Sequence, residues 1–153
     1  MSDALQVKSG SLRIGDSAPD FEARTTHGPV KLSDYRGRWL IFFSHPADFT
    51  PVCTTEFVAL ARHQDQFEAM DCALLGLSVD SLYAHLAWTR AIEERFDVQI
   101  PFPIVEDPSM AVGRAFGMID ENAADSAALA APPIAAGNIS REDDWFCHKV
   151  KAP

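Results

Sequence analysis

The chain has 153 residues, of which 47% are hydrophobic and 23% are charged, and this composition predicts one globular domain with its own apolar core. Its formal net charge of −9 argues against nucleic acid or an anionic membrane as a natural partner. Residues Met1 to Arg13 lack the apolar stretch of a secretory signal, and no apolar run approaches the length of a membrane span. We therefore expect a soluble, cytoplasmic protein.

The elements expected first in chain order surround one apolar strand. Residues Gly15 to Tyr35 mix Pro, Gly, Asp and Thr, which predicts an irregular or hairpin-rich start. Trp39–Phe43 is a continuous apolar run and predicts a strand buried on both faces. From Pro51 the spacing becomes helical, and the apolar residues that share one face are Phe57, Leu60, Ala61 and Phe67. Ala73–Val79 predicts a second buried strand.

The next segments repeat this alternation of helix and strand. Asp80 or Ser81 can cap a helix whose apolar face is formed by Leu82, Leu86, Trp88, Ile92 and Phe96. Pro101–Val105 predicts a short third strand, and Asp107-Pro108 predicts the start of a helix that runs towards Phe116. Strands that alternate with helices indicate an α/β structure with parallel strands.

Three cysteines, Cys53, Cys72 and Cys147, are odd in number and far apart, which is unlike the disulfide framework of a small secreted domain. No Cys-x-x-Cys pair is present, and the histidine spacing does not indicate a metal site. We therefore expect no metal. Cys72 precedes an apolar run and is expected in the core, where free cysteines behave as small hydrophobic residues.

The residues before Cys53 have the features of a helix start. Thr50 has a side-chain oxygen suited to the N-cap, and Pro51 suits the first helical position. Cys53 then lies in the first turn, where free backbone N–H groups and the helix dipole favour an anion. A thiolate is such an anion, and it is the thiolate that attacks peroxide oxygen. The Thr50 hydroxyl can hydrogen-bond both sulfur and peroxide, and Pro46 can shield the site from water.

A helix start alone does not activate a thiol. An unperturbed thiol with a pKa of about 8.5 is only a few per cent ionised at neutral pH, and lowering that pKa by two units needs about 2.7 kcal/mol. A helix terminus supplies about 0.3–1 kcal/mol, and about 2 kcal/mol at best. We therefore expect a second cationic group near Cys53.

The spacing Pro46-x-x-x-Thr50-x-x-Cys53 matches the active-site motif of the peroxiredoxins, and residues 43–56 resemble the peroxiredoxin 6 branch of that family. The likeness covers about Gly15 to Ala128 and includes Gly15–Phe21, Leu75–Ser81, Ile100–Pro103 and Phe116–Ile119. It implies a thioredoxin-like fold without a cofactor, and the reduction of hydrogen peroxide and organic hydroperoxides through a sulfenic acid at Cys53. It also implies a thiol reductant and a homodimer or higher homo-oligomer.

The resemblance assigns further roles around the thiol. Thr50 and Pro46 match residues that surround the reacting sulfur, and His45 matches a histidine beside it that takes part in substrate binding. An ordinary surface-loop histidine is the alternative for His45. Glu56 matches a glutamate that orients arginines, although a plain solvated helix residue is equally compatible with the sequence.

The C-terminal part departs from the family pattern. Ala130 stands where the activating arginine is expected, and the apolar elements that should follow it are missing. Residues 144–149 then resemble a far C-terminal segment, which makes Cys147 the candidate resolving cysteine, with an ordinary tail cysteine as the alternative. An extended chain from Asp125 to Cys147 spans about 70 Å, so reach does not exclude a disulfide with Cys53.

We interpret this departure as the loss of an internal block. The expected domain is residues 1–128, a thioredoxin-like core without its closing β-hairpin and helix, followed by an irregular tail over residues 129–153. Such a core should leave the Trp39–Phe43 strand with an exposed apolar edge. A catalytically impaired remnant that acts only as an interaction or oligomerising protein is the second hypothesis. A dithiol oxidoreductase is disfavoured, because Glu56 stands where its second cysteine would be.

Overall fold

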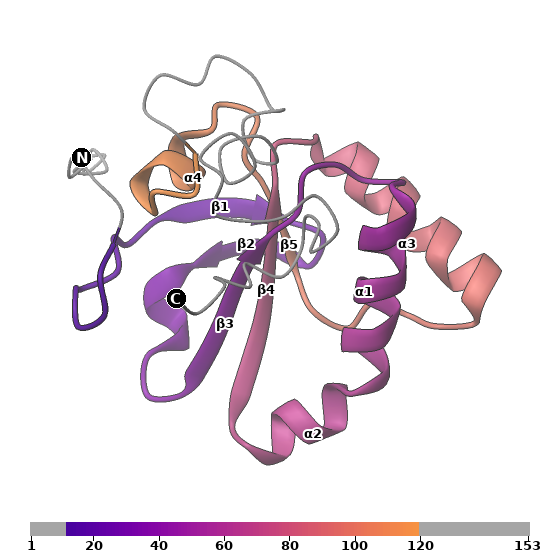
Figure 1. The fold of residues 1–153 in the computed structure, drawn as a ribbon, viewed down its shortest axis with the longest axis horizontal. Helices are drawn as coiled ribbons and strands as arrows, with labels where there is room; N and C mark the ends of the chain where they lie inside the picture. The colour runs from indigo at the N-terminus through magenta and orange to yellow at the C-terminus, as the bar shows by residue number, and fades with distance from the viewer. Residues whose placement is uncertain (1–11, 120–153) are drawn as a thin grey trace, which may run out of the picture.

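A five-stranded mixed sheet organises the residues that the computed structural model describes, which are residues 12–119 (Figure 1). Its strands in chain order are β1 (Glu22–Thr25), β2 (Gly28–Lys31), β3 (Trp39–Ser44), β4 (Cys72–Ser78) and β5 (Ile104–Glu106). In space they lie side by side in the order β2-β1-β5-β4-β3. The strands β3, β4 and β5 are parallel, while β1 is antiparallel to β2 and to β5. The α/β class and the N-terminal hairpin predicted from the sequence are confirmed.

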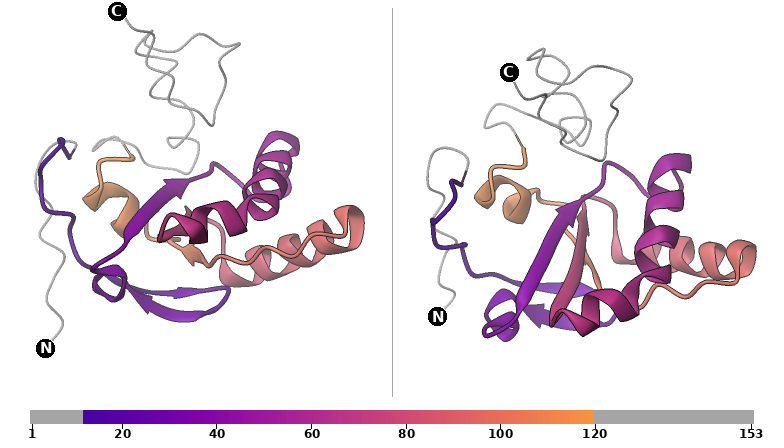
Figure 2. Two further views of the ribbon diagram at one scale, coloured as in Figure 1. Left: turned by 90° about the horizontal axis from the view of Figure 1, so that it is seen from below. Right: turned by 60° about the horizontal axis from the view of Figure 1, so that its bottom comes forward.

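Helices lie on both faces of this sheet. They are the 3-10 helix η1 (Leu32–Tyr35) and the α-helices α1 (Pro51–Arg62), α2 (Gln64–Ala69), α3 (Leu82–Phe96) and α4 (Ala111–Ala115). Figure 2 shows α1 and α3 together on one side of the sheet and α4 on the other. Parallel strands need such crossover helices, because the chain must return to the same end of the sheet after each strand.

Two apolar clusters form the core, one on each face of the sheet. The first joins α1 and α3 to the sheet and contains Cys53, Phe57, Val58, Leu74, Trp88, Ile92, Ile100, Phe102 and Ile104. The second lies towards α4 and contains Phe21, Leu75, Leu77, Val105 and Val112. Strand β4 contributes to both, because successive side chains of a strand point to opposite faces. All of its residues are buried, as predicted.

The helices depart from the sequence prediction in detail. The helical segment after Pro51 is divided at His63 into α1 and α2, yet the predicted apolar face still packs on the first cluster. Helix α3 begins at the predicted cap, since Ser81 accepts a hydrogen bond from the N–H of Ala84 at 3.3 Å. The prediction of its apolar face is partly wrong, because Leu86 and Phe96 are exposed and His85 is buried on the sheet side.

The elements after α3 begin later than predicted. Strand β5 excludes Pro101 and Pro103, since proline has no N–H to donate to a sheet. Helix α4 begins at Ala111 rather than after Asp107. The Asp107 carboxylate still satisfies the helix start, because it accepts hydrogen bonds from the N–H groups of Val112 at 3.2 Å and Gly113 at 2.7 Å.

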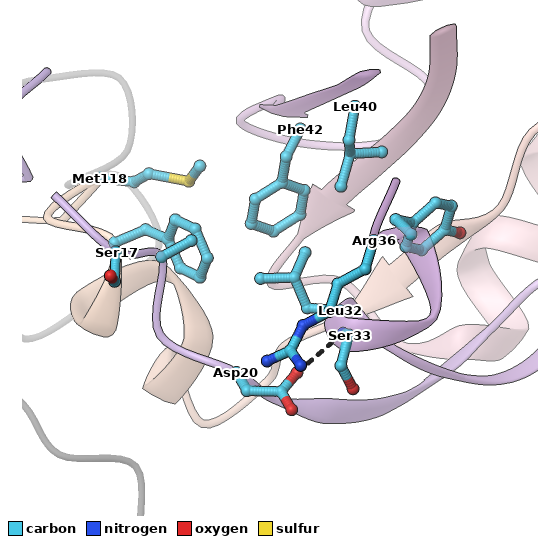
Figure 3. Close-up of a pocket in the computed structure, with 11 residues that line it drawn as sticks. Ser17, Asp20, Leu32, Ser33, Arg36, Leu40, Phe42 and Met118 are labelled. Carbon is cyan, nitrogen blue, oxygen red and sulfur yellow. Dashed lines mark hydrogen bonds between the residues drawn. The ribbon is translucent and has the colours of Figure 1, made fainter. Parts of the chain in front are cut away.

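Strand β3 is the edge of the sheet within residues 12–119, and the prediction that both its faces are buried is wrong. Trp39 is 76% exposed and Ile41 is 42% exposed. On the opposite face, Leu40 and Phe42 line a groove of about 590 Å³ together with Met118 (Figure 3). The exposed apolar edge expected for an incomplete core is therefore present in the described part of the chain.

Several expectations lie outside the described residues. These are the irregular tail over residues 129–153, the substitution at Ala130 and the candidate resolving residue Cys147. Among the helices that the structure does describe, none combines the length and apolar character needed to span a membrane.

Candidate active site

Cys53 lies in the first turn of α1, directly after the loop that leaves β3 (Figure 1). Thr50 is the N-cap residue with an extended backbone, and Pro51 occupies the first turn, as predicted. The Cys53 side chain is fully buried in the first apolar cluster, with an exposed fraction of 0%. The helix start therefore presents a thiol to the interior of the protein.

Contrary to the prediction, the Thr50 side chain does not cap the helix. It makes no hydrogen bond to the backbone N–H groups of the first turn, and its Oγ1 lies 2.6 Å from Cys53 Sγ and 2.9 Å from the carbonyl oxygen of Ala47. A hydroxyl has one proton to donate. When Cys53 is a thiol, its S–H can donate to Thr50, which donates to Ala47. When Cys53 is a thiolate, the Thr50 hydroxyl donates to sulfur instead.

The pKa of the Cys53 thiol is raised above its ordinary value. Burial is the largest cause, and the negative charge of Glu56 adds to it, whereas hydrogen bonds donated to the sulfur by the Thr50 hydroxyl and by the backbone of Ala47 and Cys53 act in the opposite direction. The main groups acting on this thiol within residues 12–119 include no cationic side chain. The second cationic group that the sequence predicts near Cys53 is therefore not among the described groups that act on this thiol.

Glu56 lies three residues after Cys53 on α1 and is partly buried. Burial raises the pKa of its carboxyl group. Across the described range, this carboxyl group has no hydrogen bond or ion pair, and partial burial distinguishes it from a plain solvated residue. An unpaired carboxylate beside a buried thiol is a suitable partner for a cation, which leaves the arginine-orienting role of Glu56 as a prediction.

His45 is buried, with an exposed fraction of 2%, so the alternative of a surface-loop histidine is wrong. Its ring packs against the rings of Phe57 and Trp88, with centroid distances of 4.9 Å to each. Both aromatic residues belong to the apolar cluster that contains Cys53. Pro46, the next residue of the loop, is partly buried.

His45 belongs to a buried polar cluster that the sequence did not predict. Asp48 lies between two histidines: its Oδ1 is 2.7 Å from His45 Nε2, and its Oδ2 is 2.7 Å from His85 Nδ1. Burial opposes ionisation of Asp48, but the hydrogen bonds from both histidines outweigh it and hold the pKa of this carboxyl group below its usual value. The cluster joins the loop before α1 to helix α3.

The sequence contains a signal for this cluster. His85 occurs three residues after Leu82 and three before Trp88, so it falls on the apolar face predicted for its helix. A histidine on such a face needs a buried polar partner. Asp48 stands within the motif around Cys53, but a separation of 37 residues hides its contact with His85 until the chain is folded.

Among the described residues, these three side chains are the only group of three or more His, Cys, Asp or Glu residues whose ligand atoms are close enough to hold a metal ion. Their ligand atoms lie within 4.8 Å of one another. Each histidine already bonds a different oxygen of Asp48 inside the cluster. We therefore interpret the group as a hydrogen-bonded network. The other described cysteine, Cys72, is buried at the start of β4, as predicted for a core residue.

Known proteins match this sequence and this fold. Residues 14–138 match the model of the AhpC/TSA family. The chain is similar to peroxiredoxin 2 of Thermoplasma acidophilum, with 54% identity over 71% of this chain and 54% of that protein. It is also similar to a peroxiredoxin of Aquifex aeolicus, with 55% identity over 70% of this chain and 49% of that protein.

Solved structures agree with these sequence relatives. A yeast mitochondrial 1-Cys peroxiredoxin, whose thiol is resolved through glutathione and thioredoxin systems, matches with a TM-score of 0.70 and 41% identity over 76% of this chain and 58% of that one. A cysteine-to-serine mutant of peroxiredoxin 6 from Arenicola marina matches with a TM-score of 0.68 and 32% identity over 78% of this chain and 56% of that one. The chain thus spans about half the length of the curated relatives it matches. By sequence and by its thioredoxin-like fold, the chain belongs to the AhpC/TSA family of peroxiredoxins.

Proposed function

We propose that this protein is a thiol-dependent peroxidase that reduces hydrogen peroxide and organic hydroperoxides at Cys53. The observation that carries the proposal is the contact of 2.6 Å between Thr50 Oγ1 and Cys53 Sγ at the start of α1. This contact supports the proposal, because a hydroxyl donor beside the sulfur and the positive end of a helix both favour a thiolate. Membership of the peroxiredoxin family supports the same chemistry.

In the proposed reaction, the Cys53 thiolate attacks one peroxide oxygen and the O–O bond breaks. The sulfur becomes a sulfenic acid, and the other oxygen leaves with a proton as water or an alcohol. A resolving thiol then attacks the sulfenic sulfur, releases water and forms a disulfide, which a thiol reductant reduces. Thr50 orients sulfur and peroxide, Pro46 excludes water, and His45 takes part in binding the peroxide.

The thiol that attacks the sulfenic acid has a candidate in this chain. We propose Cys147 as the resolving cysteine, either within one chain or between two chains of a homo-oligomer. Thioredoxin or a small thiol would complete the cycle, as is described for the yeast 1-Cys relative with its glutathione and thioredoxin systems.

Access to the buried thiol needs a path. A hollow of about 50 Å³ lies next to the site and is lined by Phe49, Thr54 and Trp88, among others. A cavity needs only about 10–15 Å³ of such space to hold one water. Cys53 does not line this hollow, so the hollow alone does not connect solvent to the sulfur.

Stopped-flow measurement of sulfenic acid formation with hydrogen peroxide tests the proposal. We expect the wild type to react with second-order kinetics and Cys53→Ser to show no reaction. Cys72→Ser is the matched control, because it removes another buried thiol and should leave the rate unchanged. Peroxide consumption by Cys53→Ser at the wild-type rate would refute the proposal. Loss of the reaction in a folded Cys72→Ser protein would refute the assignment of the chemistry to Cys53 alone.

A further inference from the structure

The hydrogen bonds of His85 define its protonation state. Its side chain is fully buried, its Nδ1 lies 2.7 Å from Asp48 Oδ2, and its Nε2 lies 3.2 Å from the carbonyl oxygen of Val105. A backbone carbonyl can only accept, so Nε2 carries a proton. An ionised carboxylate can only accept, so Nδ1 carries one as well. His85 is therefore a buried imidazolium when Asp48 is ionised.

The hydrogen bonds of His45 define a different state. Its Nε2 donates to Asp48 Oδ1 at 2.7 Å, while its Nδ1 is buried without any partner in the described structure. A proton on Nδ1 would bury a charged group with an unsatisfied N–H, which is costly. Neutral His45, protonated at Nε2, leaves on Nδ1 a lone pair that accepts hydrogen bonds. The cluster of His45, Asp48 and His85 then has zero net charge, which suits its buried position.

The same cluster holds the loop that carries Thr50. The N–H of Asp48 donates to Asp80 Oδ2 at 2.7 Å, so Asp80, just before α3, holds the backbone of Asp48, and His85 in the first turn of α3 holds its carboxylate. Directly after it, Phe49 has a positive φ of 61°, a conformation that is costly for a large side chain and persists only where surrounding contacts enforce it. Ala47 and Thr50, on either side of this point, form the hydrogen bond beside the Cys53 sulfur.

We propose that His85 is a positioning residue for the reaction at Cys53: as a buried imidazolium it holds Asp48, and through Asp48 it keeps His45 in a single tautomer. The inference rests on the proposed peroxidase function. The unpartnered Nδ1 of His45 is then an acceptor for the O–H of a hydroperoxide, held in the apolar surroundings of the thiol. His85 itself touches neither sulfur nor peroxide in this scheme.

Heteronuclear NMR of the histidine ring nitrogens tests the protonation states in the full chain at neutral pH. We expect protons on both ring nitrogens of His85 and on Nε2 alone of His45. In His85→Gln, the glutamine is neutral and cannot hold Asp48 and the Val105 carbonyl in the same way, so His45 should lose its single tautomer. Singly protonated His85 in the wild type overturns the inference, even where the variant does not fold.

Stopped-flow kinetics test the positioning role. We expect His85→Gln to react with hydrogen peroxide about tenfold to a hundredfold more slowly, because a misplacement of the reacting groups by about 1 Å can cost about a hundredfold in rate. The matched control is His63→Gln, which removes an exposed histidine bonded to the Ala59 carbonyl and should leave the rate unchanged. Since His85 acts through Asp48, the double variant that combines His85→Gln with Asp48→Asn should react no more slowly than Asp48→Asn alone.

The kinetic outcomes separate the inference from the function on which it rests. No reaction in the wild type would refute the peroxidase function, whereas NMR would still decide the protonation states. A wild-type reaction that His85→Gln retains at full rate would refute the positioning role alone. Additive losses of rate from His85→Gln and Asp48→Asn would also refute the positioning role, because they would show that His85 does not act through Asp48.

Discussion

Thr50 and Glu56 act on the Cys53 thiol in opposite directions. The Thr50 hydroxyl stabilises the thiolate, but only by giving up its hydrogen bond to the Ala47 carbonyl. Burial and the Glu56 charge both raise the pKa of the thiol. Within residues 12–119 the balance favours the thiol, so the proposed chemistry depends on a cation that neutralises Glu56 or contacts the sulfur.

Replacement of Glu56 tests this balance. If no cation pairs with Glu56, Glu56→Gln removes a negative charge beside the sulfur, and we expect the Cys53 pKa to fall. The fraction of thiolate at neutral pH then rises, and the pH profile of the peroxide reaction shifts to lower pH. Thiolate absorbance and stopped-flow rates measure both effects, with Glu94→Gln on the exposed face of α3 as the control. A higher Cys53 pKa in Glu56→Gln would show instead that Glu56 orients an activating cation.

At the scale of elements, the site depends on how strand, loop and helix follow one another. Strand β3 ends at Ser44, the loop with the strained Phe49 follows, and α1 begins at Pro51. These boundaries follow local signals, namely an apolar run and a proline at a helix start. Helix α4 shows the limit of such signals, because its start depends on where Asp107 reaches backbone N–H groups five and six residues later.

Asp107 therefore stabilises the start of α4. Asp107→Ala removes the acceptor for two backbone N–H groups, and we expect a loss of about 1–2 kcal/mol in the free energy of unfolding. Chemical denaturation measures this change. Thr89→Ala is the control, since its exposed hydroxyl donates at 3.2 Å to the Leu86 carbonyl within its own helix. Equal stability of the two variants would contradict the capping role of Asp107.

At the scale of the whole molecule, the described residues 12–119 cover one side of the sheet but leave its β3 edge uncovered. The cluster around Phe57 is closed by α1 and α3, whereas Trp39 and Ile41 on the edge strand are exposed. On the opposite face, the groove in Figure 3 is lined by Leu40 and Phe42. Exposed apolar edge strands promote pairing with other chains.

This edge predicts concentration-dependent self-association. We expect the double variant Trp39→Lys and Ile41→Lys to associate less than the wild type, because charges on an edge strand oppose strand pairing. Sedimentation velocity over a range of concentrations measures the effect. Tyr83→Lys is the matched control, since Tyr83 is equally exposed at 76% but lies on α3. Unchanged association of the double variant would exclude β3 as the contact.

The sequence by itself determined the α/β class, the buried strand β4 and the helix start that carries Cys53. These features depend on local patterns, because apolar spacing and the residues at a helix start act within a few positions of one another. The position of Cys53 in the first turn needed no structure. Its proximity to Thr50 was also expected from a separation of three residues.

Only the tertiary structure decided the environment of that cysteine. The burial that raises the Cys53 pKa comes from side chains of separate elements that meet in one cluster. The contact between Asp48 and His85 joins residues 37 positions apart, and the other oxygen of Asp48 contacts His45. Long-range contacts of this kind arise when parallel strands bring the ends of distant loops together, and a local pattern does not encode them. The sequence thus identified the candidate nucleophile, and the fold determined the charges and hydrogen bonds around it.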